Sequence, residues 1–148
     1  MRKIFRYVGV WSGNVLAIDI RTGTRKWTFR CGNEGVVASP SIMSDGTIVI
    51  GSWNRKIHAI DPSTGGSIWE LDVGEIVEST AAIDSQDNVY VGVWGGHILG
   101  IRGHDGEIMW KEMYGETSIS SGITLLRDGT IAFGSDDGRV RFLSETNV

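Results

Sequence analysis

The chain has 148 residues, a net charge of −4, and 41% hydrophobic and 22% charged residues, which is typical of one globular domain. A single cysteine, Cys31, excludes an internal disulfide and a cysteine-based zinc site. The acidic balance argues against general nucleic-acid binding, and no run of about 20 apolar residues predicts a membrane span. Met1-Arg2-Lys3 is charged, but Arg6 interrupts the apolar residues after it. No signal peptide is visible, so the default expectation is a cytoplasmic protein.

Short β-strands separated by turns are predicted along the whole chain. The first covers about 4–10, and the second unit shows the pattern most clearly, with runs at 47–50, 56–60, 67–73 and 77–83. These runs are rich in β-branched residues or alternate with period two, and Asp-Gly and Pro-containing turns separate them. A further strand is expected at about 118–125. The sequence has no helical periodicity, so it predicts an all-β protein.

The chain also repeats itself with a fixed period. One glycine returns at spacings of 42, 41 and 42 residues, at Gly9, Gly51, Gly92 and Gly134. A tryptophan keeps the same spacing, at Trp27, Trp69 and Trp110. Four antiparallel strands in each 41–42 residues predict the blades of a β-propeller, whereas all-β solenoids have shorter repeats. We expect a single domain over 1–148 with repeats at approximately 4–35, 36–76, 77–117 and 118–148.

A motif of the form A-x-D-x-x-T-G-x-x-x-W occupies 17–27 and 59–69, and 100–110 keeps its Gly and Trp. This motif resembles the tryptophan-docking repeat of the quinoprotein-like, or PQQ-like repeat, β-propellers. The resemblance implies that each Trp, on the outermost strand, stacks on small Ala and Gly residues of a neighbouring blade. The docking residues it implies are Ala17, Gly23, Trp27, Ala59, Gly65, Trp69, Gly106 and Trp110.

Other aromatic and titratable side chains have less specific patterns. A second set of tryptophans follows the second strand of three repeats, at Trp11, Trp53 and Trp94. They could line a rim or pack between blades, and packing is the favoured interpretation. His58 is expected on a strand face, and His97 and His104 in turns. None of these groups has the spacing of a metal site or of a paired nucleophile and base.

The expected strands number fourteen, about 3.5 repeats. The chain would begin with the second strand of one blade and end with the third strand of another. The resemblance implies rings of usually seven or eight blades, so this chain is either part of a longer propeller or one of two copies that complete a ring. Residues 1–30 sum to +6 and residues 61–90 to −7. These charges are either ordinary solvated loops or an attraction between two copies.

The favoured function is a non-enzymatic protein-interaction scaffold with an unidentified protein partner, and we expect no cofactor, metal or catalytic residue. The alternative is a fragment of a pyrroloquinoline-quinone-dependent dehydrogenase. The resemblance implies that the alcohol dehydrogenases of this group use adjacent cysteines, calcium ligands and a catalytic Asp inside a full ring. Cys31 has no neighbouring cysteine, and no such set of carboxylates can be assigned.

Overall fold

A computed structural model describes residues 4–144, which form four antiparallel sheets. The first sheet contains β1 (Phe5–Val10), β2 (Asn14–Asp19) and β3 (Arg25–Arg30). The second contains β4 (Ser41–Ile42), β5 (Ile48–Gly51), β6 (Lys56–Ile60) and β7 (Ser67–Asp72). The third contains β8 (Ala82–Ile83), β9 (Asn88–Gly92), β10 (His97–Arg102) and β11 (Glu107–Met113). The fourth contains β12 (Thr124–Leu125), β13 (Ile131–Gly134) and β14 (Val140–Leu143).

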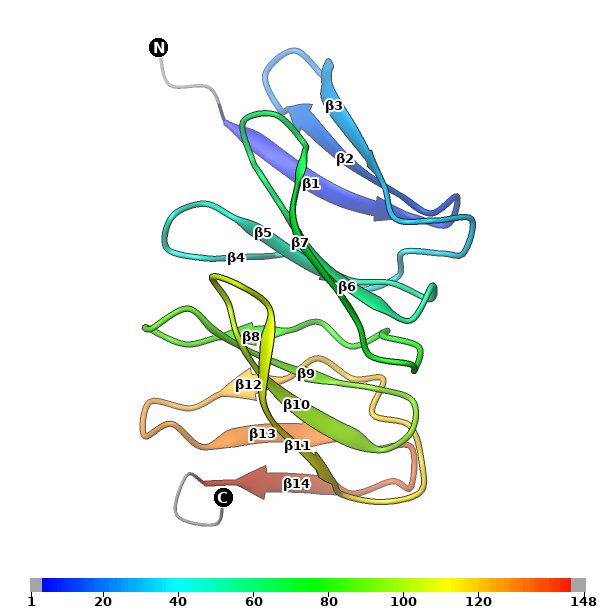
Figure 1. Ribbon diagram of the computed structural model, residues 1–148, viewed down its shortest axis with the longest axis vertical. Helices are drawn as coiled ribbons and strands as arrows, with labels where there is room; N and C mark the ends of the chain where they lie inside the picture. Colours follow the sequence, from blue (N-terminus) through cyan, green and yellow to red (C-terminus); the bar gives the residue numbers. More distant parts are fainter. Residues whose placement is uncertain (1–3, 145–148) are drawn as a thin grey trace.

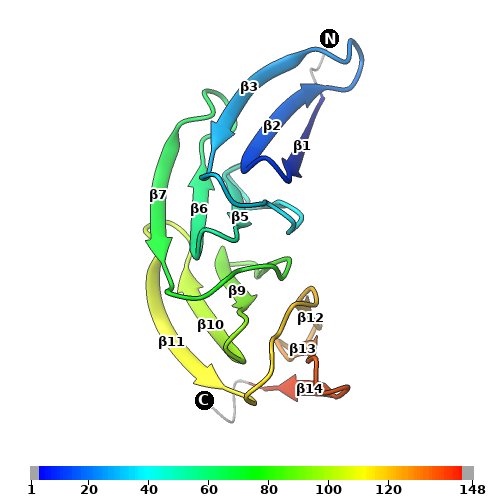
Figure 2. The ribbon, with the colours of Figure 1, turned by 90° about the vertical axis from the view of Figure 1, so that its right-hand side faces the viewer.

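The four sheets are the blades of a partial β-propeller, as the sequence predicts, and we call them blades 1 to 4. Figure 1 shows them stacked along the long axis, with the strands of each sheet in sequence order. Figure 2 shows that the blades fan out along an arc, with β3, β7 and β11 on its convex side. Blade 1 therefore begins with its second strand, and blade 4 ends with its third strand within the described part. Residues 1–3, which are rejected from the sequence as the start of a signal peptide, and the last four residues of the fourth repeat lie outside the described residues.

The inner strands are shorter than predicted. Of the expected strand at 77–83 only Ala82–Ile83 pairs in a sheet, and of 118–125 only Thr124–Leu125 does. The residues before β8 instead pass between two blades, where the Val77 amide donates to the Ser52 carbonyl at 3.2 Å. The Ser79 hydroxyl then donates to the Gly92 carbonyl at 3.0 Å and accepts from the Gly92 amide at 2.8 Å. These bonds satisfy the backbone without a regular ladder.

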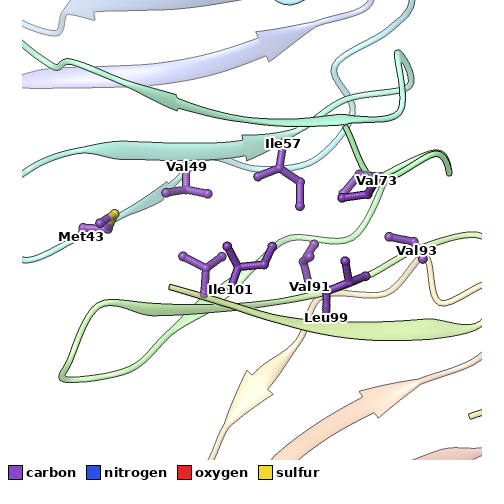
Figure 3. Packing of buried hydrophobic residues seen from close by; sticks show 10 residues of the cluster. Met43, Val49, Ile57, Val73, Val91, Val93, Leu99 and Ile101 are labelled. Atoms are coloured by element: carbon purple, nitrogen blue, oxygen red, sulfur yellow. The ribbon is translucent and has the colours of Figure 1, made fainter. Parts of the chain in front are cut away.

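The hydrophobic core lies between blades rather than within one of them. Between blades 2 and 3, Val49 and Ile57 on one side face Val91, Leu99 and Ile101 on the other (Figure 3). Similar clusters join blades 1 and 2, and blades 3 and 4. Each inner blade is consequently apolar on both faces, which explains the nearly continuous burial of β5, β6, β9 and β10.

Close approach of the chain to the second strand explains the periodic glycine. A Cβ atom at Gly51 would lie 2.2 Å from Val77 Cγ1, and one at Gly92 would lie 2.3 Å from Ile119 Cγ2. A methyl group does not fit at such distances. At Gly134, by contrast, the nearest atom is Ser121 Oγ at 3.4 Å. The glycine is therefore required where a following segment crosses the strand.

His58 is a fully buried polar residue between blades 1 and 2. Its ring makes an edge contact with Phe29 of blade 1 at a centroid distance of 5.4 Å. Asn54 Nδ2 lies 3.4 Å from its Nε2, and Glu70 Oε2 lies 3.3 Å from its Nδ1. Burial is the main cause that lowers the pKa of His58. The negative charge of Glu70 acts in the opposite direction and raises this pKa, whereas the positive charge of Lys56 lowers it further. The folded state therefore favours neutral imidazole.

We expect this histidine to make stability depend on pH. Its stabilising contribution is present above about pH 6.5, where the unfolded chain is also neutral, and is lost as pH falls toward the lower folded-state pKa. Leucine occupies the same repeat position at Leu16 and Leu99, so His58→Leu should fit. Urea unfolding at pH 7.5 and 5.0 should show a smaller loss of stability in the variant than in the parent. An equal loss in both proteins would assign the dependence to other groups.

Candidate interaction surfaces

Two of the predicted docking tryptophans lie against a turn of the next blade. The Trp27 ring covers Gly65, where an added Cβ would lie 2.6 Å from Trp27 Cδ2. Its Nε1 donates to the Pro62 carbonyl at 3.0 Å. Trp69 covers Gly106 in the same way, and its Nε1 donates to the Gly103 carbonyl at 2.6 Å. Gly65 and Gly106 also have φ values of 74° and 77°, a second reason for glycine at these positions.

The predicted alanines each pair with the tryptophan of their own sheet. Ala17 lies opposite Trp27, and Ala59 lies opposite Trp69, across adjacent strands. A β-bulge shifts the register directly after each of these alanines. The small residue thus leaves room for the ring within its own sheet, while the glycine of the next blade contacts the ring.

Gly23 and Trp110, at the two ends of the docking set, make no such contact with another blade within the described residues. An added Cβ at Gly23, in the corresponding turn of blade 1, would meet nothing within 4 Å. Trp110 lies across Gly100 of its own sheet and 6.0 Å from the Tyr90 ring. The turn that would receive Trp110 in the repeat pattern follows Ser144 and lies outside the described residues. The structure therefore brings Trp27 to Gly65 and Trp69 to Gly106, and leaves Gly23 uncovered.

The two ends of the stack expose apolar side chains. At blade 1, Val8 is 41% exposed, and Leu16 and Ile18 are partly exposed. At blade 4, Val140 and Phe142 are 68% and 67% exposed. We call these sets the blade 1 end face and the blade 4 end face. Exposed apolar side chains that are grouped on one face are typical of surfaces that contact another molecule.

The second set of tryptophans forms a row along one edge of the stack. The ring of Trp53 makes edge contacts with Trp11 and Trp94, at centroid distances of 5.1 and 5.7 Å. These residues follow the second strand of blades 1 to 3, in the turns from β1 to β2, β5 to β6 and β9 to β10. These turns lie on the right-hand edge in Figure 1. Trp11 is 68% exposed and Trp94 40% exposed. The row packs across three blades, as favoured from sequence, and also lines the rim.

A hollow of about 440 Å³ opens beside the row. Trp53, Asn54, Arg55, Ile76 and the carboxylates of Glu34 and Asp72 line it. Arg55 has a φ of 67°, whereas glycine occupies this place in the other repeats, at Gly13, Gly96 and Gly138. A non-glycine residue in this region is strained, and such strain is concentrated at functional positions.

The remaining reactive groups show no catalytic arrangement. Burial, with a smaller contribution from Glu70, raises the pKa of the Cys31 thiol to about 12, and reactive cysteines need the opposite shift. His97, expected in a turn, begins β10, and its Nδ1 lies 3.2 Å from Glu75 Oε1, which also bonds Lys111 Nζ at 2.9 Å. Within residues 4–144, no three His, Cys, Asp or Glu side chains are grouped to hold a metal ion. That same part of the chain includes no helix long and apolar enough to cross a membrane.

Comparison with known proteins identifies the family. The PQQ-like repeat model described as outer membrane protein assembly factor BamB matches residues 12–147. The chain belongs to the PQQ-like repeat β-propeller family. Among solved structures, BamB from Moraxella catarrhalis is similar over 95% of this chain, with a TM-score of 0.80 and 21% identity. The designed Ika4 protein is similar over 97% of this chain, with a TM-score of 0.82 and 17% identity.

Curated relatives of this PQQ-like repeat chain are much longer than it is. The quinohemoprotein alcohol dehydrogenase of Comamonas testosteroni is 30% identical over 106 residues, which are 66% of this chain and 14% of the enzyme. The beta-alanine-activating enzyme of Danio rerio is 39% identical over 77 residues, which are 50% of this chain and 6% of that protein. The match to BamB covers 43% of the BamB chain. These comparisons support the repeat fold, and the activities of the longer proteins do not transfer with it.

Proposed function

We propose that this propeller segment is a non-enzymatic scaffold that binds other protein chains, and that its end faces bind a second copy to complete one ring. The observation that carries the proposal is the pair of apolar end faces. Every interface between blades in the stack joins the front of one blade to the back of the next. The blade 1 end face corresponds to the surface that receives a preceding blade, and the blade 4 end face corresponds to the surface that packs on a following blade. The two end faces are therefore of the two types that pack together elsewhere in the stack.

The repeat positions of the blade 1 end face support this pairing. Val8 and Ile18 occupy the places of Ile50 and Ile60 in blade 2, which are 1% and 0% exposed because blade 1 covers them. The same surface on blade 1 remains open. Covering it with another blade would bury side chains whose equivalents are core residues, at about 25 cal/mol for each Å² of apolar surface.

Phe142 gives the blade 4 end face a bulky group where the other blades have a small one. It stands at the position of Ala17, Ala59 and Gly100, over which the tryptophans lie. In a propeller completed by two copies, the Phe142 side chain would fill the volume that Trp27 and Trp69 fill in other blades. It would face the open turn at Gly23 of the second copy. Val140 occupies the place of Ile98, which is fully buried against blade 4.

The lengths of two similar solved chains are compatible with two copies. This chain covers 43% of BamB and 43% of the designed Ika8 protein, which has a TM-score of 0.81 and 17% identity, so two copies approach one such chain. The opposite charges of residues 1–30 and 61–90 do not contribute to this closure. The acidic segment runs from the turn before β7 to β9, in the middle of the stack, whereas closure joins blade 1 to blade 4.

Light scattering coupled to gel filtration tests the proposal. The chain should have about twice its mass of 16.2 kDa, and Phe142→Glu should be a folded monomer because a carboxylate would be buried unpaired at the interface. Met113→Glu, at a residue 60% exposed on an outer strand, is the matched control and should remain dimeric. A folded parent chain of 16.2 kDa, or a dimeric Phe142→Glu, would contradict ring closure.

Two finer assignments belong to this proposal. We assign Trp27 and Trp69 as docks that fix adjacent blades, supported by their contacts with Gly65 and Gly106. We also keep one domain over 1–148 with repeats at about 4–35, 36–76, 77–117 and 118–148, supported by the four sheets.

The similarity to quinohemoprotein alcohol dehydrogenase supports the alternative, a fragment of a quinone-dependent dehydrogenase. Addition of pyrroloquinoline quinone with Ca²⁺, followed by dye reduction with alcohols or sugars, separates the two. We expect no dye reduction above a protein-free control. Alcohol-dependent reduction would replace the scaffold proposal with the enzymatic one.

A further inference from the structure

The fold does not require an indole at the positions of the tryptophan row. Trp53 and Trp94 each donate a backbone N–H to the preceding connection, to Gly35 and Ile76 carbonyls at 3.1 Å. Asp136 occupies the equivalent place in blade 4 and makes the same bond, to the Ser118 carbonyl at 3.0 Å, without an aromatic ring. The turn therefore forms with or without an indole, so the backbone geometry of the turn does not explain the three tryptophans.

Two features of the row lower the stability of the fold or contribute little to it. Trp11 is mostly exposed, and it rests on Gly35, where an added Cβ would lie 2.8 Å from Trp11 Cε3. The Trp53 Nε1 atom is buried and has no hydrogen-bond partner within residues 4–144. An unpaired buried N–H destabilises a fold, and exposed aromatic groups at a rim are typical of binding surfaces.

Three carboxylates lie beside the row. Glu34 and Asp72 line the hollow beside Trp53, and within the described residues neither forms a salt bridge. Glu78 Oε2 accepts a hydrogen bond from Trp94 Nε1 at 2.9 Å. Arg55 also lines this hollow, and Lys56, which lies opposite Asp72 across the strands, donates to Glu70 instead. The surface thus combines π faces with negative charge.

Guanidinium groups match this combination better than other side chains. The flat cation stacks on an indole face and at the same time donates paired hydrogen bonds to a carboxylate. A lysine ammonium is more strongly hydrated and has no planar face to stack. In an extended peptide, side chains on one face recur about every 7 Å, so alternate residues of such a peptide can contact different parts of the row.

We infer that the tryptophan row and the Glu34–Asp72 hollow bind an extended protein segment with arginine at alternate positions. This site is separate from ring closure, because the row and the hollow lie within one copy, on the edge of blades 1 to 3. Arg55, strained in place of glycine, opposes the incoming cation and limits the affinity. The indoles supply the stacking surface, and Glu34 and Asp72 supply the charge.

Calorimetric titration with a synthetic Arg-Ser-Arg-Ser-Arg-Ser peptide tests this inference, with Lys-Ser and Glu-Ser peptides of the same length alongside. The arginine peptide should bind at least fivefold more tightly than the lysine peptide, and the glutamate peptide should not bind. Affinity for the arginine peptide should fall with added salt, since part of it is electrostatic. No binding of the arginine peptide, or binding of the lysine or glutamate peptide as tight as that of the arginine peptide, would overturn the inference.

Variants locate the site and separate it from ring closure. Trp11→Ala and Glu34→Gln should each weaken binding at least threefold, and Arg55→Gly should strengthen it about twofold. Phe142→Glu and Met113→Ala should bind the arginine peptide as the parent does. The peptide result can therefore be interpreted even if the chain does not form a dimer. Circular dichroism and thermal unfolding of every variant confirm that it is folded. If folded Trp11→Ala and Glu34→Gln bind the peptide with unchanged affinity, the peptide does not bind at this surface.

Discussion

Trp69→Ala is expected to lower the free energy of unfolding by about 3–5 kcal/mol. Burying an aromatic ring of about 200 Å² contributes at most about 5 kcal/mol at 25 cal/mol/Å². The ring also covers Gly106 of the next blade and donates to the Gly103 carbonyl at 2.6 Å. Because Gly106 cannot supply side-chain atoms to refill the space, a cavity should remain between blades 2 and 3. Urea unfolding followed by circular dichroism measures the loss.

Two further variants isolate the cause of that loss. Trp69→Phe keeps an aromatic ring and removes the indole N–H, so about 1 kcal/mol should be lost from the hydrogen bond together with a smaller packing loss. Trp11→Ala is the same substitution at a mostly exposed tryptophan and should cost about 1 kcal/mol or less. A loss below about 1 kcal/mol for Trp69→Ala would contradict the docking role.

The architecture could be predicted because its signals recur along the chain. A glycine and a tryptophan at one shared spacing define the blades without knowledge of any contact. Strand number and blade order follow from that spacing and from alternation. The predicted inner strands are too long because runs such as 77–83, with small and β-branched residues, are equally suited to a sheet and to a crossing between blades.

Contacts between blades could not be predicted in the same way. The motif relates Ala17, Gly23 and Trp27 within one repeat, but it does not say that the Trp27 ring covers Gly65 of the next repeat, because that contact depends on how adjacent blades pack. His58 shows the same limit, since alternation places it on a face without saying that Phe29 covers it. Departures from the repeat were the available signal for the binding surface. Arg55 stands where other repeats have glycine, and Asp136 stands where they have tryptophan.

Gly51→Ala should be among the most destabilising single-methyl additions in the chain, at about 1–3 kcal/mol. The added Cβ would lie 2.2 Å from Val77 Cγ1 and 3.1 Å from the Val77 carbonyl oxygen. Val77 is fully buried and its amide is bonded to Ser52, so it cannot move aside without breaking that bond or separating blades 2 and 3. The stability difference is measured by urea unfolding.

Gly134→Ala is the matched control at the same repeat position. No following blade crosses β13 within the described residues, and the nearest atom to an added Cβ is Ser121 Oγ at 3.4 Å. The substitution also limits the conformations of the unfolded chain, so its cost should be within about 0.5 kcal/mol. If close approach of the crossing segment is the reason for the glycine, the two variants must differ by at least about 1 kcal/mol. Equal costs would mean that backbone conformation, and not the crossing, selects glycine at this position.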